Sequence, residues 1–591
     1  MPLLLLLLLS SPDAVFIQRT VTVDLSMTDT GYVETTSETI VPLTARGVSR
    51  YGTMTSSYRN GWESLQVLAS VRHWRSGRGE DDADIREEPH SSLLAGGRLE
   101  SSLREVHISF PGLEVGDTIL VEVTRTIRKL PLDDLYSYTY YAASRDSIHR
   151  GVFRVITPPD RELRHSVSGE FAMSVSTGER GEVLLWEAGP QRPIPLLPFS
   201  PHPAALSPRV TVASHTPRQV SAVLYSRLVE DCLGHGTSSS AQLAIAAGED
   251  PVELRDWVAA EIEYLGADWG DYPGYTPKTP EETLADRAGV CRDQALLLAW
   301  LLDRAGYDPV LVLTSLSGSM GPLPGSRSFD HMLVALADPG GDTLFLDPVN
   351  QMAAEGYTYT LRGREYLPLT PEGSPPGRFP DPGEGDTLRI RITGELDPEA
   401  DILEGEITAE FSGSAEELFR YMLSSVPADR SHRLLQRLFG ALPSSALIIE
   451  GDPRSPGSSL RVTGRGRWRV LHVLWDGSVT LILPGLSGID LVGSRASAFL
   501  MPEFRERLFV ETPYTALLVL RVGNLPPGGA VLPEPVGMEG YGLEMSIEED
   551  TLELVEILSL VPAFPGPEET ASIREACLSS ISAAHRNVTF R

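Results

Sequence analysis

The chain has 591 residues, of which 41% are hydrophobic, so three or four domains with sizeable cores are expected. Asp and Glu number 80 against 50 Lys and Arg, which gives a net charge of −30. This balance argues against nucleic acid or anionic lipid as a partner, because clustered basic side chains bind both. A solvated surface is enough to explain the acidity.

The N-terminus is predicted to be a secretory signal over residues 1–13. An apolar block, Leu3 to Leu9, is followed by small residues. The first basic residue is Arg19, so the signal is atypical or the start codon is assigned too late. We expect a periplasmic or extracellular protein. Elsewhere no apolar run reaches the roughly 18 residues needed to span a bilayer, so no integral membrane segment is expected.

The three cysteines are Cys232, Cys291 and Cys577. They form no C-x-x-C pair and show no metal-ligand spacing with histidine. No disulfide framework, metal site or cofactor is therefore expected. The sequence also contains no calcium-loop motif.

Residues 14–205 are predicted to form a β-sandwich. Apolar residues alternate with polar ones at residues 21–25, 106–110 and 119–123, as in half-buried strands. Turn-forming residues separate these runs, which is typical of a sandwich. The scattered histidines form no catalytic cluster, so we expect a binding or positioning role. A Pro-rich linker follows at residues 189–208.

Residues 215–370 are predicted to form a domain of mixed helices and strands. Asp250 followed by Pro251 is typical of a helix start, with the Asp as N-cap. Thr279, Pro280 and Glu282 repeat the pattern as a capping box. These two helices are therefore expected before Cys291, after an earlier helical face formed by Val220, Leu224 and Leu228.

Cys291 stands just before a run of good helix formers, Gln294 to Arg304, and Gly306 and Pro309 mark the end of that run. We therefore expect the thiol in the first turn of a helix. Unpaired N–H groups and the helix dipole favour a thiolate there. The helix is apolar almost all round, which indicates that it is buried and holds the sulfur in one place.

His331 opens a predicted strand that ends at residue 337, and Asp347 follows a second one, residues 343–346. The Asp-Pro-Gly-Gly sequence between them indicates a turn, so the strands should pair as an antiparallel hairpin. A three-residue turn, or any odd number, puts His331 and Asp347 on one face, whereas a two-residue turn puts them on opposite faces. The hairpin can thus hold a carboxylate against an imidazole that takes the proton of the Cys291 thiol.

These three sites resemble the bacterial transglutaminase-like superfamily, which has a papain-related Cys-His-Asp core. The motifs are Gly-Val-Cys-Arg-Asp at 289–293, Phe-Asp-His at 329–331 and Leu-Asp-Pro at 346–348. The resemblance covers residues 250–350. It implies that Cys291 is the nucleophile, His331 the general base and Asp347 the residue that orients it. Asp330 stands where Asn is common, and it adds a second carboxylate that could orient His331.

A second resemblance concerns the N-terminal region. The segment FPGLEVGDTILVEV, residues 110–123, is similar to a domain of unassigned function. That domain commonly precedes transglutaminase-like cores in exported bacterial proteins. It implies no known chemistry.

The oxyanion of an acyl-transfer intermediate needs hydrogen-bond donors. The Cys291 backbone N–H is one candidate. From the aromatic stretch of residues 264–275 we take Trp269 as the other, although packing within the domain is the better explanation of any single aromatic residue there. Residues 315–328, rich in Gly, Ser and Pro, are predicted to form a mobile loop at the rim of the cleft, with a plain connector as the alternative.

Residues 385–591 are predicted to form a β-rich domain with a helical insertion, after a Pro/Gly linker at residues 371–386. Helical patterns cover residues 414–442 and 567–585. Alternating apolar residues indicate strands, among them residues 388–392, 460–462, 468–475 and 479–483. No catalytic motif is found in this region.

The sequence thus predicts a multidomain α+β protein with a cysteine hydrolase or acyltransferase at its centre. Its substrate would be a protein or peptide, cleaved or modified at a peptide or glutamine-type amide through an acyl-enzyme. The residues do not separate hydrolysis from amine transfer, and the resemblance favours hydrolysis. The alternative is a non-catalytic scaffold whose β domains bind a cell-envelope partner around an inert core.

Overall fold

The computed structural model describes most of the chain. The described residues are 12–28, 30–74, 79–89, 103–128, 130, 135–194, 206–230, 250–265, 277–316, 319–325, 328–337, 343–350, 352, 356–380, 386–453, 460–473, 478–486, 492, 514–526, 529–560, 567–581 and 587–590. The chain divides into two compact units. Residues 1–196, 202–349 and 364–379 form the first, and residues 197–201, 350–363 and 380–591 form the second.

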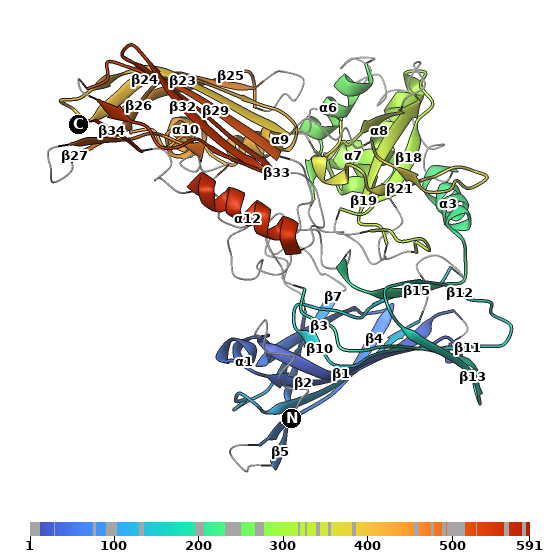
Figure 1. The fold of residues 1–591 in the computed structure, drawn as a ribbon. Helices are drawn as coiled ribbons and strands as arrows, with labels where there is room; N and C mark the ends of the chain where they lie inside the picture. The colour runs from blue at the N-terminus through green and yellow to red at the C-terminus, as the bar shows by residue number, and fades with distance from the viewer. Residues whose placement is uncertain are drawn as a thin grey trace. The chain divides into compact units, whose positions relative to one another are not determined.

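Among the described residues up to residue 194, the N-terminal part of the first unit is built of strands with one short helix, α1 (Ala45–Tyr51) (Figure 1). The strands of its large sheet are β1 (Ala14–Asp24), β2 (Tyr32–Pro42), β4 (Glu63–His73), β5 (Gly79–Asp82), β8 (Thr118–Ile127), β10 (Ser147–Ile148), β11 (Gly151–Thr157), β13 (Ala172–Gly178) and β14 (Gly181–Ala188). Their order is β13-β14-β11-β1-β2-β8-β4-β5, with β10 beside β1.

Two three-stranded sheets pack on this large sheet. One is β3 (Thr53–Arg59), β7 (Leu103–Ser109) and β6 (Asp84–Pro89), and the other is β12 (Arg164–Ser168), β15 (Arg209–Ala213) and β9 (Ser137–Tyr141). Each is joined to the large sheet by its own core, with Ile40, Val71 and Ile108 in the first and Phe153, Trp186 and Val212 in the second. The β-rich character is confirmed, and the region contains three sheets where the sequence predicts the two of a sandwich.

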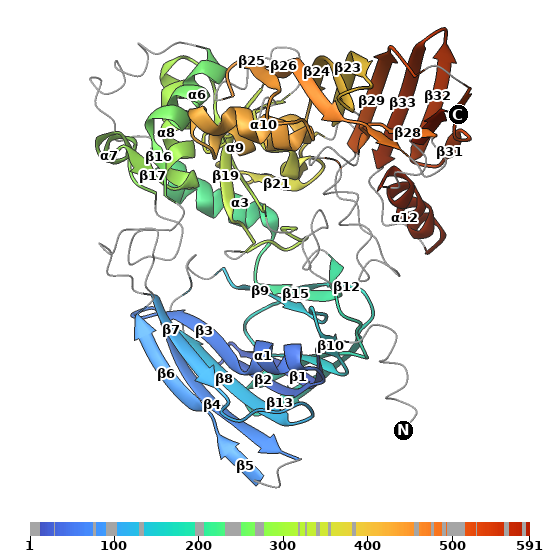
Figure 2. The same cartoon turned by 90° about the vertical axis from the view of Figure 1, so that its left-hand side faces the viewer.

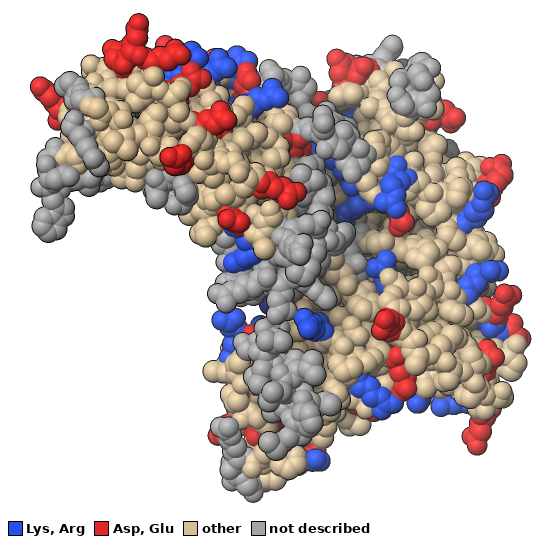
Figure 3. Space-filling model, in the orientation of Figure 1, with Lys and Arg blue, Asp and Glu red and all other residues tan. Residues whose placement is uncertain are grey.

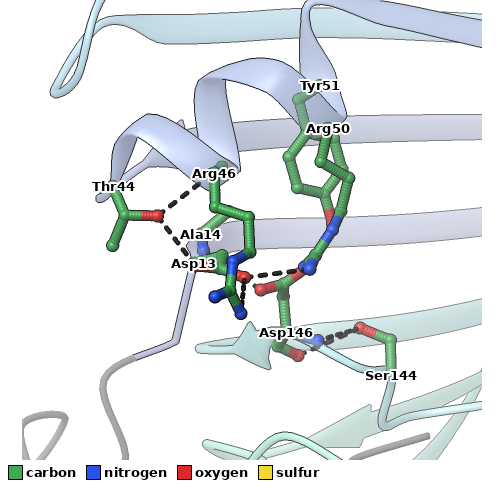
Figure 4. A network of polar contacts seen from close by, with 9 residues as sticks. Asp13, Ala14, Thr44, Arg46, Arg50, Tyr51, Ser144 and Asp146 are labelled. Atoms are coloured by element: carbon green, nitrogen blue, oxygen red, sulfur yellow. Dashed lines mark hydrogen bonds and ion pairs between the residues drawn. The ribbon is translucent and has the colours of Figure 1, made fainter.

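A buried carboxylate fixes the start of β1 (Figure 4). Asp146 is 1% exposed, and its Oδ1 accepts the backbone N–H of Ala14 at 3.0 Å. Its Oδ2 accepts from Arg50 at 2.7 Å and from the Tyr51 hydroxyl at 2.8 Å. Burial and the Asp146 carboxylate raise the pKa of Tyr51, so the hydroxyl stays protonated and remains a donor. The first strand and α1 are thereby tied to one anion.

The rest of the first unit mixes helices with a five-stranded antiparallel sheet. The helices are α3 (Pro217–Tyr225), which runs into a π-helical turn, α6 (Pro251–Glu261), α7 (Pro280–Asp286) and α8 (Cys291–Arg304). The sheet order is β20 (Thr343–Leu346), β19 (His331–Ala337), β18 (Val310–Thr314), β21 (Glu365–Pro368) and β22 (Gly377–Arg378). A short parallel pair, β16 (Glu263–Tyr264) and β17 (Ala288–Gly289), precedes α8. Helix α8 packs against β19 and α6.

The helix starts lie where the sequence predicts them. The Asp250 side chain accepts the N–H groups of residues 252 and 253 at the start of α6. Thr279 and Glu282 form the predicted capping box of α7. Residues 293–302 of α8 are all buried, as the apolar composition of that helix predicts.

The second unit contains two sheets around a single large core (Figure 2). The eight-stranded sheet has the order β25 (Ala446–Glu450), β26 (Arg461–Arg469), β24 (Ile402–Phe411), β23 (Thr387–Asp397), β29 (Tyr514–Gly523), β33 (Thr551–Leu560), β32 (Tyr541–Glu548) and β31 (Val536–Met538). The four-stranded sheet is β27 (Leu471–Val473), β28 (Val479–Ile482), β34 (Asn587–Phe590) and β30 (Ala530–Val531). The helices are α9 (Ser414–Ser424), α10 (Ser431–Leu438) and α12 (Pro567–Ile581), in the two predicted helical regions.

One predicted break in this unit is wrong. The sequence suggests separate strands at residues 460–462 and 468–475, whereas β26 runs unbroken from Arg461 to Arg469. Gly464 and Gly466 look like a turn, but both pair within the sheet, because β24 and β25 flank the strand on its two sides. At Gly466 a Cβ would lie 2.1 Å from the Trp468 ring, so the glycine makes room for that side chain.

Acidic and basic side chains are interspersed on the face of the molecule drawn in Figure 3. Within the described part of the chain, no helix is long and apolar enough to cross a membrane.

Candidate active site

Cys291 is the first residue of α8, and a network of backbone contacts fixes its position. Asp293, buried one turn into the helix, accepts the N–H of Val290 at 3.0 Å through Oδ2 and the N–H of Lys278 at 2.9 Å through Oδ1. A Cβ at Gly289 would lie 2.8 Å from the Asp293 side chain, so only glycine fits there. The Gly-x-Cys-Arg-Asp motif is thus a device for starting a helix at the sulfur.

The same helix start is tied to the segment after α6. The buried Gln294 side chain donates to the Ile262 carbonyl at 2.9 Å. The N–H of Leu265 donates to the Gly289 carbonyl at 2.9 Å, and Tyr264 pairs with Gly289 in the β16–β17 bridge. Residues 262–265 therefore lie directly beside the entrance to the helix that carries Cys291.

His331 and Asp347 meet on one face of the hairpin, as the sequence predicts. The strand register pairs Val334 with Leu346, which gives the even sum that puts His331 and Asp347 on the same side. His331 Nε2 lies 2.8 Å from Asp347 Oδ2, and the two residues are 5% and 1% exposed. Asp347 Oδ1 accepts the N–H of Val349 at 3.0 Å, which holds the carboxylate in place.

The second carboxylate, Asp330, has another role. Its Oδ1 accepts the N–H of Leu316 at 2.6 Å, and its Oδ2 accepts the Ser315 hydroxyl at 3.4 Å. Asp330 thus holds the backbone of the loop that follows β18. The carboxylate that contacts the His331 ring is that of Asp347.

The electrostatics of His331 connect all three predicted residues. Burial lowers the pKa of the ring, but the Asp347 carboxylate and a hydrogen bond with Cys291 outweigh burial and raise the pKa to about 10. Because Nε2 faces Asp347, Nδ1 is the ring nitrogen left for the sulfur. The half-buried Cys291 and the buried His331 and Asp347 thus form one cluster. Within this cluster the protonated, imidazolium form of His331 is favoured.

Two family models match the chain. A domain of unknown function, DUF3857, matches residues 28–195. The family described as the transglutaminase-like domain matches residues 246–336, which include Cys291 and His331. This chain carries a transglutaminase-like domain. It is preceded by the domain of unknown function that the sequence around residue 110 resembles, so both resemblances are confirmed. The boundaries predicted at residues 205, 215, 370 and 385 stay predictions.

The fold of the whole chain has a counterpart among solved structures. A putative protease from Parabacteroides distasonis ATCC 8503 is 12% identical, with a TM-score of 0.66 over 98% of this chain and 99% of that one. A putative cysteine protease from Cytophaga hutchinsonii is 15% identical, with a TM-score of 0.16 over 36% of this chain and 75% of that one. Native yeast LTA4 hydrolase gives 10% identity and a TM-score of 0.20 over 34% and 29%. None of the curated proteins compared with the chain matches it.

Tyr264 lies in the transglutaminase-like domain, at the start of the aromatic stretch in which the sequence predicts Trp269 as the donor. Its side chain is 49% exposed, and burial and then the Cys291, Asp347 and Asp330 side chains raise its pKa. Its hydroxyl therefore stays protonated, and its backbone pairing with Gly289 places Tyr264 next to the start of the helix that carries Cys291. The predicted donor, Trp269, lies outside the described residues. The start of the aromatic stretch was the available signal, but only the pairing of Tyr264 with Gly289 places it at the site.

The loop before His331 is held at two points. Met320 is buried in the core of the domain, and the Pro324 carbonyl accepts from His215 Nε2 at 2.9 Å. Residues 317, 318, 326 and 327 lie outside the described part, and the mobility of the loop stays a prediction.

The other cysteines are elsewhere. Cys577 is buried in α12 of the second unit, where burial raises its pKa to about 12. Cys232 lies outside the described residues. In the part of the chain that the structure describes, no group of three or more His, Cys, Asp or Glu side chains has the arrangement of a metal site.

Proposed function

We propose that the chain is a cysteine hydrolase or acyltransferase acting on peptide or glutamine-type amide bonds. The observation that carries the proposal is the position of His331, which bonds to Asp347 on one side and to Cys291 on the other. A thiol, an imidazole and a carboxylate in this order are the parts that acyl transfer through a thioester requires.

The first half of the reaction follows from these positions. His331 holds the proton of the Cys291 thiol, so the sulfur attacks the amide carbonyl as a thiolate. The carbonyl oxygen becomes an oxyanion, which the N–H of Cys291 and the Tyr264 hydroxyl stabilise by donating hydrogen bonds. His331 then gives its proton to the leaving nitrogen, the C–N bond breaks, and a thioester joins the acyl group to Cys291.

The second half regenerates the thiol. His331, now neutral, takes a proton from an attacking water or primary amine, and Asp347 stabilises the imidazolium that forms. Water yields a carboxylic acid, and an amine yields a new amide. The side chain of Tyr264 is half-exposed, so solvent reaches the cluster from the side on which this residue lies. Together with the shared fold of the Parabacteroides protein described as a putative protease, this openness favours hydrolysis.

The proposal can be tested without knowing the substrate. We expect iodoacetamide to alkylate Cys291 rapidly at pH 7, because alkylation follows the thiolate fraction. The His331→Ala variant should lose this rapid labelling. The buried Cys577 is the internal control, because burial keeps it protonated and covered.

Labelling of Cys291 that is no faster than that of Cys577, or that is unchanged in His331→Ala, would contradict the proposal and favour an inert scaffold. For an active protein, ammonia release from peptidyl glutamine, peptide cleavage and incorporation of a fluorescent primary amine separate the three possible reactions.

A further inference from the structure

One edge of the large N-terminal sheet is open. Strand β13 is at the end of the sheet order, with β14 as its only neighbour among the described strands, and Figure 1 shows it at the margin of the sheet. All seven of its residues are exposed, and none of them carries a charged side chain. The unpaired backbone groups along such a strand are able to pair with another strand.

The opposite edge of the same sheet is protected. It is formed by β5, a strand of four residues that include Glu80, Asp81 and Asp82. Short length and charged side chains are the usual means by which an exposed edge avoids pairing with other chains. The contrast between the two edges, in a chain with a net charge of −30, indicates that β13 is suited to a partner strand.

The side chains of β13 add an apolar surface to this edge. Met173 pairs with Trp186 in the register, so both side chains are on the face that packs in the core, and Val175 likewise pairs with Leu184. Trp186 is fully buried, and its ring lies 5.6 Å from that of His165 in β12, the edge strand of the small sheet on this face. One strand farther out, Met173 and Val175 are 43% and 54% exposed. The covering sheet thus ends before β13.

The hairpin determines which backbone groups of β13 are free. Gly178 pairs with Gly181 across a two-residue turn, so the N–H and C=O of Gly178 point towards β14. Because the direction alternates along an antiparallel strand, the N–H and C=O groups of Met173, Val175 and Thr177 point away from the sheet. Val175 is the middle residue of the strand, so its backbone groups are at the centre of the free row.

We propose that β13 pairs antiparallel with β13 of a second copy of this chain, around a two-fold axis at Val175, and so joins two large sheets into one. The two Val175 residues then exchange both backbone hydrogen bonds, and Met173 of each copy pairs with Thr177 of the other. The exposed apolar side chains meet on one face of the joined sheet. The segment is thus complementary to itself, as a two-fold interface requires.

The charges beyond the ends of β13 favour a second copy in this orientation. Antiparallel pairing around Val175 brings Glu170 of one copy opposite Arg180 of the other, and Glu179 opposite the uncharged Phe171. A parallel pairing would instead put the two Glu170 carboxylates side by side. Arg180 contacts Asp24 at 2.5 Å, and its side chain is 55% exposed, so its guanidinium has donors left for a second carboxylate.

Sedimentation equilibrium of the full chain tests the inference independently of any activity. A single pair of strands is a small interface, so we expect a reversible dimer with a micromolar dissociation constant. Between about 1 µM and about 100 µM, the mass should rise from one chain towards two. A mass of one chain over the whole range overturns the inference. Assembly beyond two chains also overturns it, because the two-fold pairing uses both open edges.

Substitutions at the centre of β13 locate the interface. Val175→Pro removes the central outward N–H and keeps the hydrogen bonds to β14, so the dissociation constant should rise by about tenfold or more while the melting temperature stays close to that of the wild type. Val175→Lys brings two like charges together and should have the same effect. Leu68→Lys, at an exposed leucine of β4 in the same sheet, is the matched control and should dimerise like the wild type.

The outcomes of these variants decide the point. An unchanged dissociation constant in folded Val175→Lys overturns the inference, and so does an equal loss of dimer in Leu68→Lys. If Val175→Pro does not fold, Val175→Lys carries the test, because it changes only an exposed side chain.

Cysteine cross-linking checks the register. In a Cys291→Ser background, Val175→Cys should form a disulfide between two chains under mild oxidation, because the two-fold axis places the two sulfurs opposite each other. Thr177→Cys should not, because the two positions are then about 13 Å apart along the strands. Equal cross-linking at both positions overturns the proposed pairing.

Discussion

The first unit contains two buried histidine–carboxylate pairs that look alike and differ in what faces the other ring nitrogen. His331 Nε2 lies 2.8 Å from Asp347, and His73 Nδ1 lies 2.8 Å from Asp117 in the N-terminal β region. The other nitrogen of His73 lies 3.4 Å from the Asp81 carboxylate, whereas the remaining nitrogen of His331 faces a thiol.

The surroundings of the two carboxylates explain the difference. Asp117 also accepts the N–H groups of Trp74 at 3.1 Å and Glu114 at 3.0 Å, so it joins the end of β4 to the turn before β8. That pair joins two segments of one sheet, and the second ring nitrogen of its histidine faces a carboxylate where that of His331 faces a thiol. The comparison teaches that a buried His–Asp contact by itself only stabilises the fold. It can serve catalysis where the first turn of a helix places a cysteine sulfur at the second ring nitrogen.

The largest expected effect separates the two histidines. His331→Ala should lower kcat/KM for an amide substrate by about a thousandfold or more, because the proton carrier is lost. His73→Ala should lower the melting temperature and leave kcat/KM of the folded protein unchanged. Steady-state kinetics and thermal unfolding of both variants check this. Equal kinetic losses would mean that the N-terminal pair takes part in the reaction.

The carboxylates should differ in the same way. We expect Asp347→Asn to lower kcat by about a hundredfold to ten-thousandfold, because an amide no longer stabilises the imidazolium or fixes the ring tautomer. Asp117→Asn, the matched change in the other pair, should leave kcat within about twofold. Kinetics at pH 7 with both purified proteins decide the point. A fully active Asp347→Asn protein would leave Asp330 as the carboxylate to test next.

Removing the Tyr264 hydroxyl should lower the activity less than removing the His331 ring or the Asp347 charge. Tyr264→Phe should lower kcat by about a hundredfold with a smaller change in KM, because the donor acts on the oxyanion formed in the transition state. The half-exposed ring is retained, so the melting temperature should not change. Tyr307→Phe, at another exposed tyrosine of the same domain, is the control. An unchanged kcat would mean that the Tyr264 hydroxyl does not help the Cys291 N–H to stabilise the oxyanion.

The smallest effects are on stability, and their pH dependence has opposite directions in the two pairs. The pKa of His331 is raised from 6.5 to about 10. The contribution of protonated His331 to the free energy of unfolding is therefore complete below pH 6.5 and is lost as the pH rises towards 10. Burial raises the pKa of Asp117, but hydrogen bonds from the Glu114 backbone and from His73 outweigh burial and lower it below 3.8. The contribution of the Asp117 carboxylate to the free energy of unfolding is therefore present above pH 3.8 and is lost in stronger acid.

Melting temperatures between pH 3 and pH 10 measure both effects. The difference between the wild-type protein and His331→Ala should narrow as the pH rises above 6.5. The difference between the wild-type protein and Asp117→Asn should narrow as the pH falls below 3.8. A difference that is constant over the whole range in either variant would contradict the corresponding pKa shift.

The candidate site was predictable where it depends on local sequence. The position of Cys291 in a first helical turn follows from the helix formers after it, and the shared face of His331 and Asp347 follows from strand parity. These are short-range rules, and the register and the caps confirm them.

The parts that the sequence did not reveal depend on packing between distant segments. Tyr264 enters the site because β16 pairs with β17. Likewise, the glycines of β26 suggest a break because the partner strands that hold them cannot be seen from the sequence.

The position of β1 affects the order in which the N-terminal region can form. This strand precedes β2 and β11 in the sequence, yet it lies inside the sheet between them, and its parallel partners β10 and β11 begin only at Ser147. The hydrogen bonds on the parallel side of β1 and the bond from Ala14 to Asp146 can thus form only after more than 130 further residues have been synthesised. A fragment that stops before residue 147 would expose the edge of β1 to neighbouring chains, and such an edge is a template for aggregation.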